Sequence, residues 1–435
     1  MNKIFDRYLR TLAQTEKFPP RELRRYQQIL VENLARHAHE LAPFYRDRLA
    51  VLFDREGKFD FSRWSEVPIL TRDNARESSA AMRVGGLRKN LGPVQEIQTS
   101  GTSGAPLMLT VNGLARVAYN AALTRTAGWY GADTSRDLAQ IRVFLSGPPA
   151  TYPEGLAVKG WSAAHPEASS FCLDLRTPVT QQIEWLSRRK CPYLMTSPSN
   201  AMAISYAATA EQAGELGIEI IFSIGETVIP GARELVARRL GARLVGIYSA
   251  EEVGYIAAEC PVSGHYHVVA ETTLVEIVDD RGAPAKPGES GRVLVSGLYN
   301  YATPFIRYEV GDVASFDEAP CACGRGLPVL LEIHGRTRNA FIFRDGRRAW
   351  PRAWDARAME ELVPCREFQI VQTTYEMIEF RYVADNSNRV PDIEGLNAYA
   401  RANLHPSVTV MPVAVSVIKA APGGKHEPFI SMLGR

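Results

Sequence analysis

Apolar and polar positions alternate at helical spacing near the start of the chain. Between residues 21 and 41, apolar side chains recur at three- and four-residue steps, with charged residues between them: Leu23, Tyr26, Leu30 and Leu34. This pattern predicts an amphipathic helix that ends before Pro43. Residues 64–72 are typical of a connector into a second helix, whose N-cap is Thr71 or Asp73.

The middle of the chain alternates short apolar runs with a helical segment. Residues 218–224 and 242–247 predict two strands, and residues 230–240 predict the helix between them. A strand, a helix and a strand at this spacing indicate a parallel sheet. Further on, residues 273–278 and 292–296 predict strands of a hairpin-rich region.

A change of pattern near Gly335 and Arg336 predicts a domain boundary. The segment after it predicts a hairpin at Asp345-Gly346, a helix at 354–362, and strands at 368–372, 378–383 and 408–418. The sequence therefore predicts an α/β protein. Residues 1–336 form a large N-terminal domain with parallel and mixed sheets and a β-rich subregion, and residues 337–435 form a small α+β domain.

Composition narrows the class of protein. A chain of 435 residues that is 46% hydrophobic and 23% charged is long enough for more than one core. Its 50 basic and 48 acidic residues nearly balance, which gives no reason to expect a nucleic acid or membrane partner. The chain shows neither a secretory signal nor a run of about 20 apolar residues, so we expect a cytoplasmic protein. The oligomeric state stays open, with a homodimer among the alternatives.

A short run rich in serine, threonine and glycine is the first chemical signal. It consists of Thr99, Ser100, Gly101, Thr102, Ser103 and Gly104. Glycines let a backbone approach a ligand closely, and successive N–H and hydroxyl groups supply donors for phosphate oxygens. The run lacks the Gly-Lys-Ser/Thr ending of a Walker loop. Taken alone, it fits a pyrophosphate-holding loop or an ordinary surface loop.

Further motifs follow this run in a fixed order. They are Gly225-Glu226, Tyr248-Ser249-Ala250-Glu251-Glu252, Arg307-Tyr308-Glu309-Val310-Gly311-Asp312, Gly335-Arg336 and Gly423-Gly424-Lys425. With the loop at 99–104, the ordered set resembles the adenylate-forming superfamily of acyl-CoA synthetases and ligases, and within it the phenylacetate-CoA ligase-like branch. The resemblance covers nearly the whole chain. It implies an N-terminal adenylation domain and a mobile C-terminal domain that rotates about a hinge near Arg338.

The resemblance also implies an activity. We expect ATP-dependent activation of a small carboxylic acid, aromatic rather than aliphatic, as its acyl-adenylate, followed by transfer to CoA to give acyl-CoA, AMP and pyrophosphate. Transfer to an amine or another nucleophile is one alternative, and a non-catalytic member that binds an acid or a nucleotide is another. We expect the acid pocket to include Phe144, Tyr193 and the loop at 197–199.

Individual roles come from the same resemblance. Glu252 is implied as the Mg²⁺ ligand, and Asp312 as the acceptor for the ribose hydroxyls. Lys425 is implied as the catalytic cation that bridges the acid and the α-phosphate. Tyr248 is implied to stack on adenine, and Arg336 to contact ribose or phosphate oxygens. The remaining nucleotide-binding positions are Gly225, Glu226 and Ser249. A surface carboxylate, a turn-capping aspartate, a surface lysine, a core tyrosine and a surface arginine are the respective alternatives.

Several positions depart from the pattern of the superfamily. Ala105 stands where many relatives have lysine, and Arg338-Asn339 replaces an acidic pair. Ser249 replaces a glycine, and Glu251 replaces a threonine or serine. A carboxylate at position 251 repels a triphosphate unless it binds the metal or points away.

Cysteine and histidine form a second constellation. It comprises Cys260, His265, His267, Cys321 and Cys323, and some members of the resembled branch carry a similar set. Thiolate and imidazole are the ligands of a structural Zn²⁺, although the Cys-Ala-Cys spacing is tighter than usual. We expect a zinc site formed by Cys260, His267 in preference to His265, Cys321 and Cys323. The alternative is two loops with unrelated, reduced cysteines.

Overall fold

The computed structural model describes residues 2–99, 107–144, 148–385, 387–418 and 427–433. Contacts between residues divide the chain into two compact units. Unit 1 comprises Met1–Ser135, Ser162–Glu167 and Ile247–Ile333, and unit 2 comprises Arg136–Trp161, Ala168–Gly246 and His334–Arg435.

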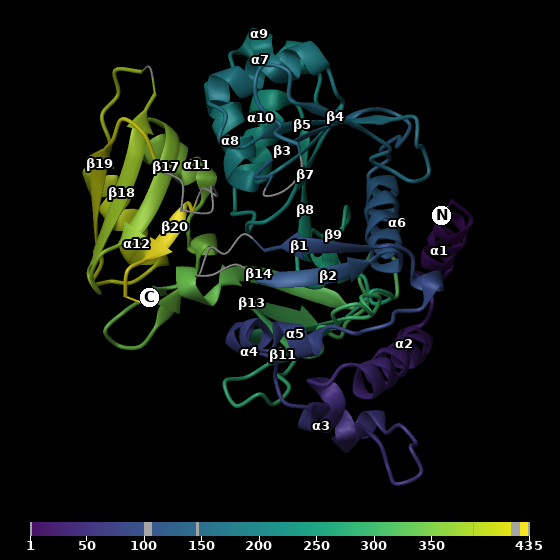
Figure 1. Cartoon of the computed structure of the whole chain (residues 1–435). Helices are drawn as coiled ribbons and strands as arrows, with labels where there is room; N and C mark the ends of the chain where they lie inside the picture. Colours follow the sequence, from purple (N-terminus) through teal and green to yellow (C-terminus); the bar gives the residue numbers. More distant parts are fainter. Residues whose placement is uncertain (1, 100–106, 145–147, 386, 419–426, 434–435) are drawn as a thin grey trace. The chain divides into compact units, whose positions relative to one another are not determined.

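The helices of unit 1 come from its N-terminal part. They are α1 (Asn2–Thr15), α2 (Pro20–Leu41), α3 (Tyr45–Leu49), α4 (Arg72–Glu77), α5 (Ser79–Met82) and α6 (Gly113–Trp129). The predicted amphipathic helix at 21–41 is confirmed as α2. Thr71 caps α4, since its hydroxyl accepts the N–H of Asn74 at 3.2 Å. Helix α1 lies along α6 (Figure 1), because Phe5 and Leu12 form a buried cluster with Val117 of α6.

A largely antiparallel sheet forms the other layer of unit 1. Its strands lie in the order β11, β12, β13, β14, β10, β9 and then the end of β8. Their bounds are Thr273–Val278, Ser290–Gly297, Tyr308–Asp317, Val329–Arg336, Tyr266–Val268, Gly254–Glu259 and Arg243–Ala250. A separate hairpin pairs β1 (Val94–Gln98) with β2 (Met108–Asn112). The core packs side chains of α2, such as Leu34, against sheet residues such as Ile256 and Val293.

A parallel sheet organises the first part of unit 2. Strands β5 (Ser169–Asp174), β3 (Leu138–Arg142), β6 (Tyr193–Thr196), β7 (Ile220–Ser223) and the start of β8 run parallel, and β4 (Leu156–Lys159) is antiparallel at the edge. The connecting helices are α7 (Val179–Arg189), α8 (Pro198–Ala207), α9 (Ala210–Leu216) and α10 (Ala232–Leu240). The predicted strand, helix and parallel strand are thus confirmed as β7, α10 and β8.

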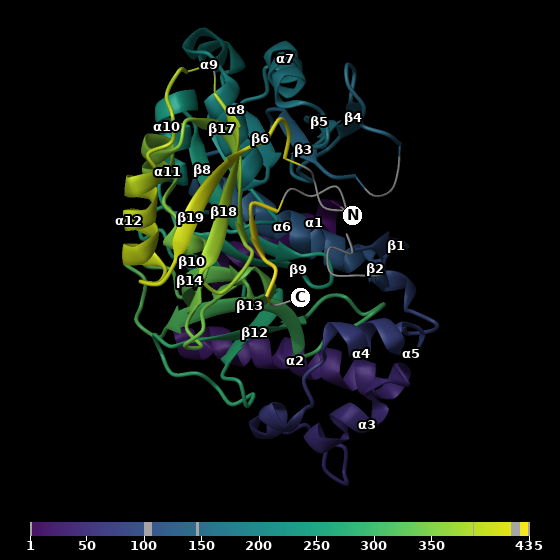
Figure 2. The same ribbon diagram turned by 90° about the vertical axis from the view of Figure 1, so that its left-hand side faces the viewer.

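The C-terminal segment of unit 2 contains a small mixed sheet. The order is β19 (Thr409–Ala414), β18 (Met377–Ala384), β17 (Cys365–Gln372) and β20 (Phe429–Ser431), with α11 (Ala356–Leu362) and α12 (Ile393–Asn403) beside it (Figure 2). A short ribbon of β15 (Phe341–Ile342) and β16 (Arg348–Ala349) precedes it and contains the predicted turn. The strand predicted at 408–418 is too long. It ends at Ala414, which pairs with Tyr382 near the end of its partner strand.

This small sheet shares one hydrophobic core with helices α8 and α10. Ile204 and Leu235 belong to the same buried cluster as Phe368 and Phe380. At the start of α11 the N–H of Ala356 donates to the carbonyl of Pro230 at 2.8 Å. The predicted domain boundary between residues 336 and 337 stays a prediction. Among the described helices, none combines the length and apolar character that a membrane span requires.

Candidate functional site

Asp312 lies at a break in the pairing of β12 and β13. The register shifts between Arg292 and Leu294, so that additional residues of β13, including Gly311 and Asp312, bulge out of the ladder. Gly311 adopts φ +82°, a backbone conformation that a side chain would oppose. Such a bulge re-aims the side chain that follows it. The bulge at Gly311 therefore determines the direction in which the Asp312 side chain points.

Tyr248 meets Asp312 from a strand 64 residues earlier. Its hydroxyl donates to Asp312 Oδ2 at 2.8 Å, and both residues are buried. Ser249 follows Tyr248 on β8, where the pairing with β9 is also irregular. The residue expected to stack on adenine thus contacts the residue expected to hold the ribose.

Glu252 is buried in the turn between β8 and β9, whereas its neighbour Glu251 is exposed. Arg72 Nη1 donates to Glu252 Oε1 at 2.8 Å, and the hydroxyl of Tyr308 donates to the same oxygen at 3.2 Å. Burial, and then the nearby Glu252 carboxylate, raise the pKa of Tyr308, so the hydroxyl stays a donor at neutral pH. Within the described part of the chain, Oε2 of Glu252 has no hydrogen-bond partner.

Thr99 stands at the end of β1, directly before residues 100–106. Its N–H donates to the carbonyl of Leu107 at 3.0 Å, and its hydroxyl accepts the N–H of Leu107 at 3.1 Å. The same hydroxyl accepts from Arg72 Nη2 at 2.9 Å. Residues 100–104, which are the rest of the expected phosphate loop, lie outside the described residues.

These contacts form two sets of side chains on shared segments of the chain, Arg72 with Thr99, Glu252 and Tyr308, and Tyr248 with Asp312, and we call the two sets together the carboxylate corner. Its members are Arg72, Thr99, Tyr248, Glu252, Tyr308 and Asp312. Three motifs that are far apart in the sequence, at 99, 248–252 and 307–312, are thereby brought together in unit 1. The sequence also named Arg307, which proves structural. Its buried guanidinium bonds to Glu276 and to the carbonyls of Ser65 and Val67.

A second polar cluster lies at the carboxyl ends of the parallel strands in unit 2. Ser199, just inside α8, donates its N–H and its hydroxyl to the carboxylate of Glu226, at 3.2 and 2.9 Å. Gly225 precedes Glu226 with φ +81°. Ligands of open α/β sheets bind at such strand ends. Tyr193, one of the residues expected in the acid pocket, is buried and its ring contacts Trp161 and Phe222.

Arg336 and Arg338, which the sequence predicts to lie near a hinge, are at the end of β14 and just after it. Arg336 is the last residue of β14, and Arg338 forms an ion pair with Glu427 at 2.8 Å. Lys425, the expected catalytic lysine, lies outside the described residues.

The expected zinc ligands converge in unit 1. One ligand atom each from Cys260, His267, Cys321 and Cys323 lies within 4.8 Å of all the others. The Sγ atoms of Cys260 and Cys321 are 3.8 Å apart, and His267 Nε2 lies 3.1 Å from Cys323 Sγ. A tetrahedral Zn²⁺ with Zn–S bonds of about 2.3 Å has S–S edges of about 3.8 Å. Three thiols and one imidazole are therefore suitable ligands for a zinc ion, and the distance between two of the sulfur atoms matches a tetrahedral site.

The pKa shifts of His267 and Cys260 favour a metal site in this cysteine cluster, whereas the shift of Cys323 opposes it. Burial lowers the pKa of His267 to about 4, so the ring is neutral at pH 7, as a metal ligand must be. Burial opposes ionisation of Cys260, yet hydrogen bonds from the backbone of Ser263 and Val262 outweigh it and lower the pKa of that thiol. Burial raises the pKa of Cys323.

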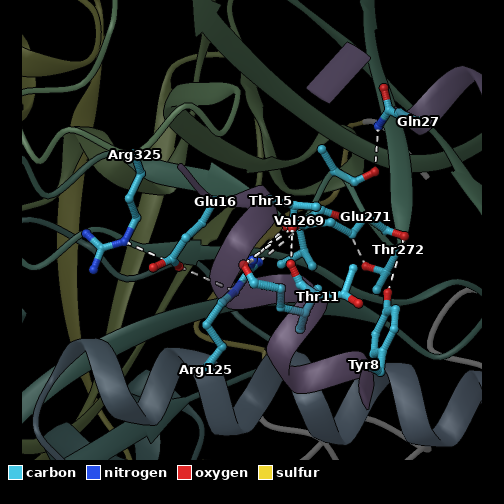
Figure 3. Close-up of polar contacts among 12 residues, drawn as sticks. Tyr8, Thr11, Thr15, Glu16, Gln27, Arg125, Val269, Glu271, Thr272 and Arg325 are labelled. Carbon is cyan, nitrogen blue, oxygen red and sulfur yellow. Dashed lines mark hydrogen bonds and ion pairs between the residues drawn. The ribbon is translucent and has the colours of Figure 1, made fainter. Parts of the chain in front are cut away.

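The cysteine cluster is braced by residues around the end of α1. The ring of Trp129 contacts the ring of His267 edge-on, with centroids 5.9 Å apart. The guanidinium carbon of Arg325 lies 4.4 Å from the centroid of the same Trp129 ring. Trp129 Nε1 donates to Glu16 at 3.0 Å. Figure 3 shows Arg325 and Arg125 both directed at the Glu16 carboxylate, with N–O distances of 3.7 and 4.0 Å.

A buried ion pair continues this bracing network. Arg125 Nη1 lies 2.8 Å from Glu271 Oε1, and their side chains are only 5% and 0% exposed. Glu271 Oε1 also accepts from the hydroxyl of Thr15 at 2.6 Å (Figure 3). The network therefore ties α1 and α6 to the loop that carries the cysteines.

Comparison with solved structures reveals the fold to which this arrangement belongs. The crystal structure of 2-hydroxyisobutyryl-CoA ligase in complex with 2-HIB-AMP matches with a TM-score of 0.75 and 21% identity, over 96% of this chain and 91% of that one. A benzoate CoA ligase from Burkholderia xenovorans LB400 matches with a TM-score of 0.54 and 13% identity, over 79% of this chain and 68% of that one. The anthranilate CoA ligase AuaEII, in complex with anthranoyl-AMP, matches with a TM-score of 0.55 and 13% identity, over 75% and 64%.

The chain has the fold of the adenylate-forming CoA ligases. The fold predicted from the sequence is thereby confirmed, with its large N-terminal part and its small C-terminal α+β part. Models of protein families give no match to the sequence, and curated protein sequences give none either.

Two members of the carboxylate corner were not anticipated from the sequence. Tyr308 lies inside a motif that was recognised, but its contact with Glu252 crosses 56 residues. Arg72 follows an N-cap threonine and contacts a residue 180 positions away. Only the position of Tyr308 within its motif could have drawn attention to it, and no local signal marks Arg72.

Proposed function

We propose that this chain is an AMP-forming ligase that activates a small, aromatic carboxylic acid as its acyl-adenylate and then transfers the acyl group to CoA. The observation that carries this proposal is the carboxylate corner. It gathers motif residues from three distant segments and directs a buried carboxylate whose second oxygen has no partner among the described residues. The shared fold with CoA ligases supports the choice of CoA as the acceptor.

The residues of the corner match what acid adenylation demands. Attack of a carboxylate on the α-phosphate brings anions together, so that charge and orientation must both be controlled. In this proposal Glu252 Oε2 holds Mg²⁺, which supplies positive charge to the phosphate oxygens. Asp312, oriented by Tyr248, accepts the ribose hydroxyls. Thr99 anchors the start of the pyrophosphate-holding loop.

The other expected roles belong to the same proposal. Gly225 and Glu226 bind the nucleotide, and Arg336 contacts the ribose or the phosphates. Lys425 bridges the acid and the α-phosphate during adenylation. The C-terminal segment after residue 336 moves between the two steps. These assignments rest on the motif order in the sequence.

For the cysteine cluster we infer a structural Zn²⁺ held by Cys260, His267, Cys321 and Cys323. A site with four protein ligands leaves no position for substrate, which is typical of structural zinc. Its bracing by Trp129 and Glu16 supports a role in stability rather than in catalysis.

Pyrophosphate release tests the proposed activity. The wild-type protein is incubated with ATP, Mg²⁺ and a panel of aromatic and aliphatic acids, first without an acceptor and then with CoA or with amines. We expect release with at least one acid and formation of a thioester with CoA. A product formed only with an amine would replace CoA as the acceptor. Failure with every acid, together with binding of ATP, would point to a non-catalytic protein.

A further inference from the structure

Arg72 connects two parts of the carboxylate corner that no other described side chain joins directly. Its Nη1 donates to Glu252 Oε1 at 2.8 Å, and its Nη2 donates to Thr99 Oγ1 at 2.9 Å. We propose that Arg72 is a positioning residue. It holds the metal-binding carboxylate of Glu252 and the hydroxyl of Thr99 at a fixed separation for Mg·ATP. This inference rests on the proposed function, because it assigns Arg72 a role in binding that substrate.

The backbone just before Arg72 is bonded to the start of β13, the strand that carries Tyr308 and Asp312. The N–H of Leu70 donates to the carbonyl of Arg307 at 2.9 Å, and the carbonyl of Leu70 accepts the N–H of Glu309 at 3.0 Å. Tyr308 lies between those two residues on β13. Thr71 then caps α4, so Arg72 is its first residue. The start of α4 is therefore held beside Tyr308 by backbone hydrogen bonds on both sides.

The shape of the guanidinium suits this double contact. Arginine presents several N–H donors in a rigid plane, so that its two terminal nitrogens can bond two acceptors at a fixed separation. A lysine ammonium keeps the charge but lacks the fork. The side chain of Arg72 is 27% exposed and that of Glu252 is 9% exposed, so this pair is better shielded from solvent than an ordinary surface ion pair.

The same contact explains how Glu252 is aimed. Arg72 and Tyr308 both donate to Oε1, so this oxygen is anchored and the carboxylate plane is fixed. Oε2 is then left to bind a cation. Arg72 also balances the charge of Glu252 before the nucleotide arrives, which reduces the repulsion between that carboxylate and the incoming phosphates. Loss of Arg72 removes the orientation and the charge balance together.

Thr99 is the second residue to which the Arg72 guanidinium donates. Its hydroxyl accepts from both Arg72 and the N–H of Leu107, so the guanidinium helps to fix the Thr99 rotamer that bonds to Leu107. Without Arg72, the Thr99 hydroxyl is held, among the described residues, only by the N–H of Leu107, so this bond should open more often and the amide of Leu107 should exchange faster with solvent. This effect needs no nucleotide and no turnover.

The experiment compares Arg72→Gln, Arg72→Lys and Tyr308→Phe with the wild type. Arg76→Gln is the matched control, because Arg76 is on the same helix and pairs only with the exposed Asp73 among the described residues. Equilibrium binding of Mg·ATP is measured by calorimetry without any acid, and the binding of ATP is titrated with Mg²⁺. Hydrogen exchange reports the amide of Leu107.

For Arg72→Gln we expect roughly tenfold weaker binding of Mg·ATP, the size of a lost charge-assisted hydrogen bond. We also expect a higher Mg²⁺ requirement and faster exchange at Leu107. Arg72→Lys should recover part of the affinity, and Tyr308→Phe should lose about threefold, since Oε1 keeps Arg72. Arg76→Gln should match the wild type in every measurement.

The two hypotheses fail in different ways. If the wild type binds Mg·ATP and Arg72→Gln binds it equally well with the same Mg²⁺ dependence, the role of Arg72 is wrong while the proposed function stands. If the wild type does not bind Mg·ATP, the proposed function is wrong, and unchanged exchange at Leu107 in Arg72→Gln would overturn the positioning role as well. Where Arg72→Gln does not fold, Arg72→Lys decides the same points.

Discussion

The carboxylate corner and the cysteine cluster belong to the same unit, and both join residues that are distant in the sequence. They differ in what they leave free. In the corner, donors saturate one oxygen of Glu252 and leave the other without a partner in the described part of the chain. In the cluster, the ligand atoms converge on a common point, behind a brace of aromatic and charged side chains.

Under the proposed function, this difference separates a site that binds a substrate from a site that stabilises the fold. A substrate site must keep oriented groups with unused bonding capacity, because that capacity is what the ligand takes up. A structural metal site uses all of its capacity within the protein. The buried ion pair of Arg125 with Glu271 is closer to the second pattern, since the Thr15 hydroxyl and the Leu12 carbonyl also bond to it. We therefore expect variants in the corner to change activity, and variants in the cluster to change stability.

The largest effect is expected for Glu252→Gln. Gln keeps the size of the side chain and can accept from Arg72, but it removes the negative charge that we propose to bind Mg²⁺. We expect adenylation, measured as pyrophosphate release, to fall by about 10²–10³-fold in kcat/KM, comparable to losing one preorganised electrostatic group. The melting temperature should change little.

The neighbouring carboxylate supplies the control for this variant. Glu251 is exposed in the same turn, so Glu251→Gln removes an equal charge about one residue away from the corner. Its activity should stay near that of the wild type. Equal losses in the two variants would mean that only the general negative charge of the turn matters, and the comparison between corner and cluster would lose its basis.

The next effect concerns the cysteine cluster. Cys323→Ala should lower the zinc content from about one per chain to near zero, and should lower the melting temperature by roughly 10 °C, since structural zinc contributes folding free energy. At a temperature where the variant is folded, kcat/KM should stay within about threefold of the wild type. Metal analysis of protein purified without a histidine tag, with thermal unfolding, measures both.

Cys191→Ala is the matched control, because Cys191 is a buried cysteine outside the cluster. It should retain zinc in full. A wild-type protein without zinc would refute the metal assignment. A Cys323→Ala protein that is stable but inactive would assign the cluster to catalysis and erase the contrast with the corner.

The sequence predicts structure best where the pattern that determines it is local. Regular elements followed from local patterns, as with β7, α10 and β8, whose apolar periodicity lies within short windows. The strand predicted at 408–418 failed because its length depends on the partner β18, which ends at Ala384. The apolar pattern of one strand does not predict where its partner strand ends.

Long-range polar contacts were the other limit. The cysteine ligands could be proposed because thiol and imidazole have few roles and stand out in the sequence. Arg72 could not, because arginine is common on surfaces and its partners are 27 and 180 residues away. Arg125 and Glu271 escaped notice for the same reason, since a buried ion pair has no local pattern. The long-range partners of charged residues are thus the hardest part of each site to predict from the sequence.

The smallest expected effect tests how finely the corner is oriented. Tyr248→Phe removes only the hydroxyl that donates to Asp312 Oδ2 at 2.8 Å. A hydrogen bond to a charged acceptor contributes about 1–2 kcal/mol, so we expect KM for ATP to rise by about fivefold, with kcat nearly constant. Asp312→Asn should cost more, and the double variant should cost no more than Asp312→Asn, because the hydroxyl acts through that carboxylate.

Stacking of Tyr248 on adenine predicts a different result from the same set of variants. Phenylalanine would then replace tyrosine without loss, and only Tyr248→Leu would weaken ATP binding. Additive losses in the double variant would separate Tyr248 from Asp312 and contradict an orienting role. A cycle of the four proteins, with steady-state kinetics in ATP, therefore decides whether this hydroxyl aims the carboxylate, as Arg72 is proposed to aim Glu252, or whether the ring itself binds the nucleotide.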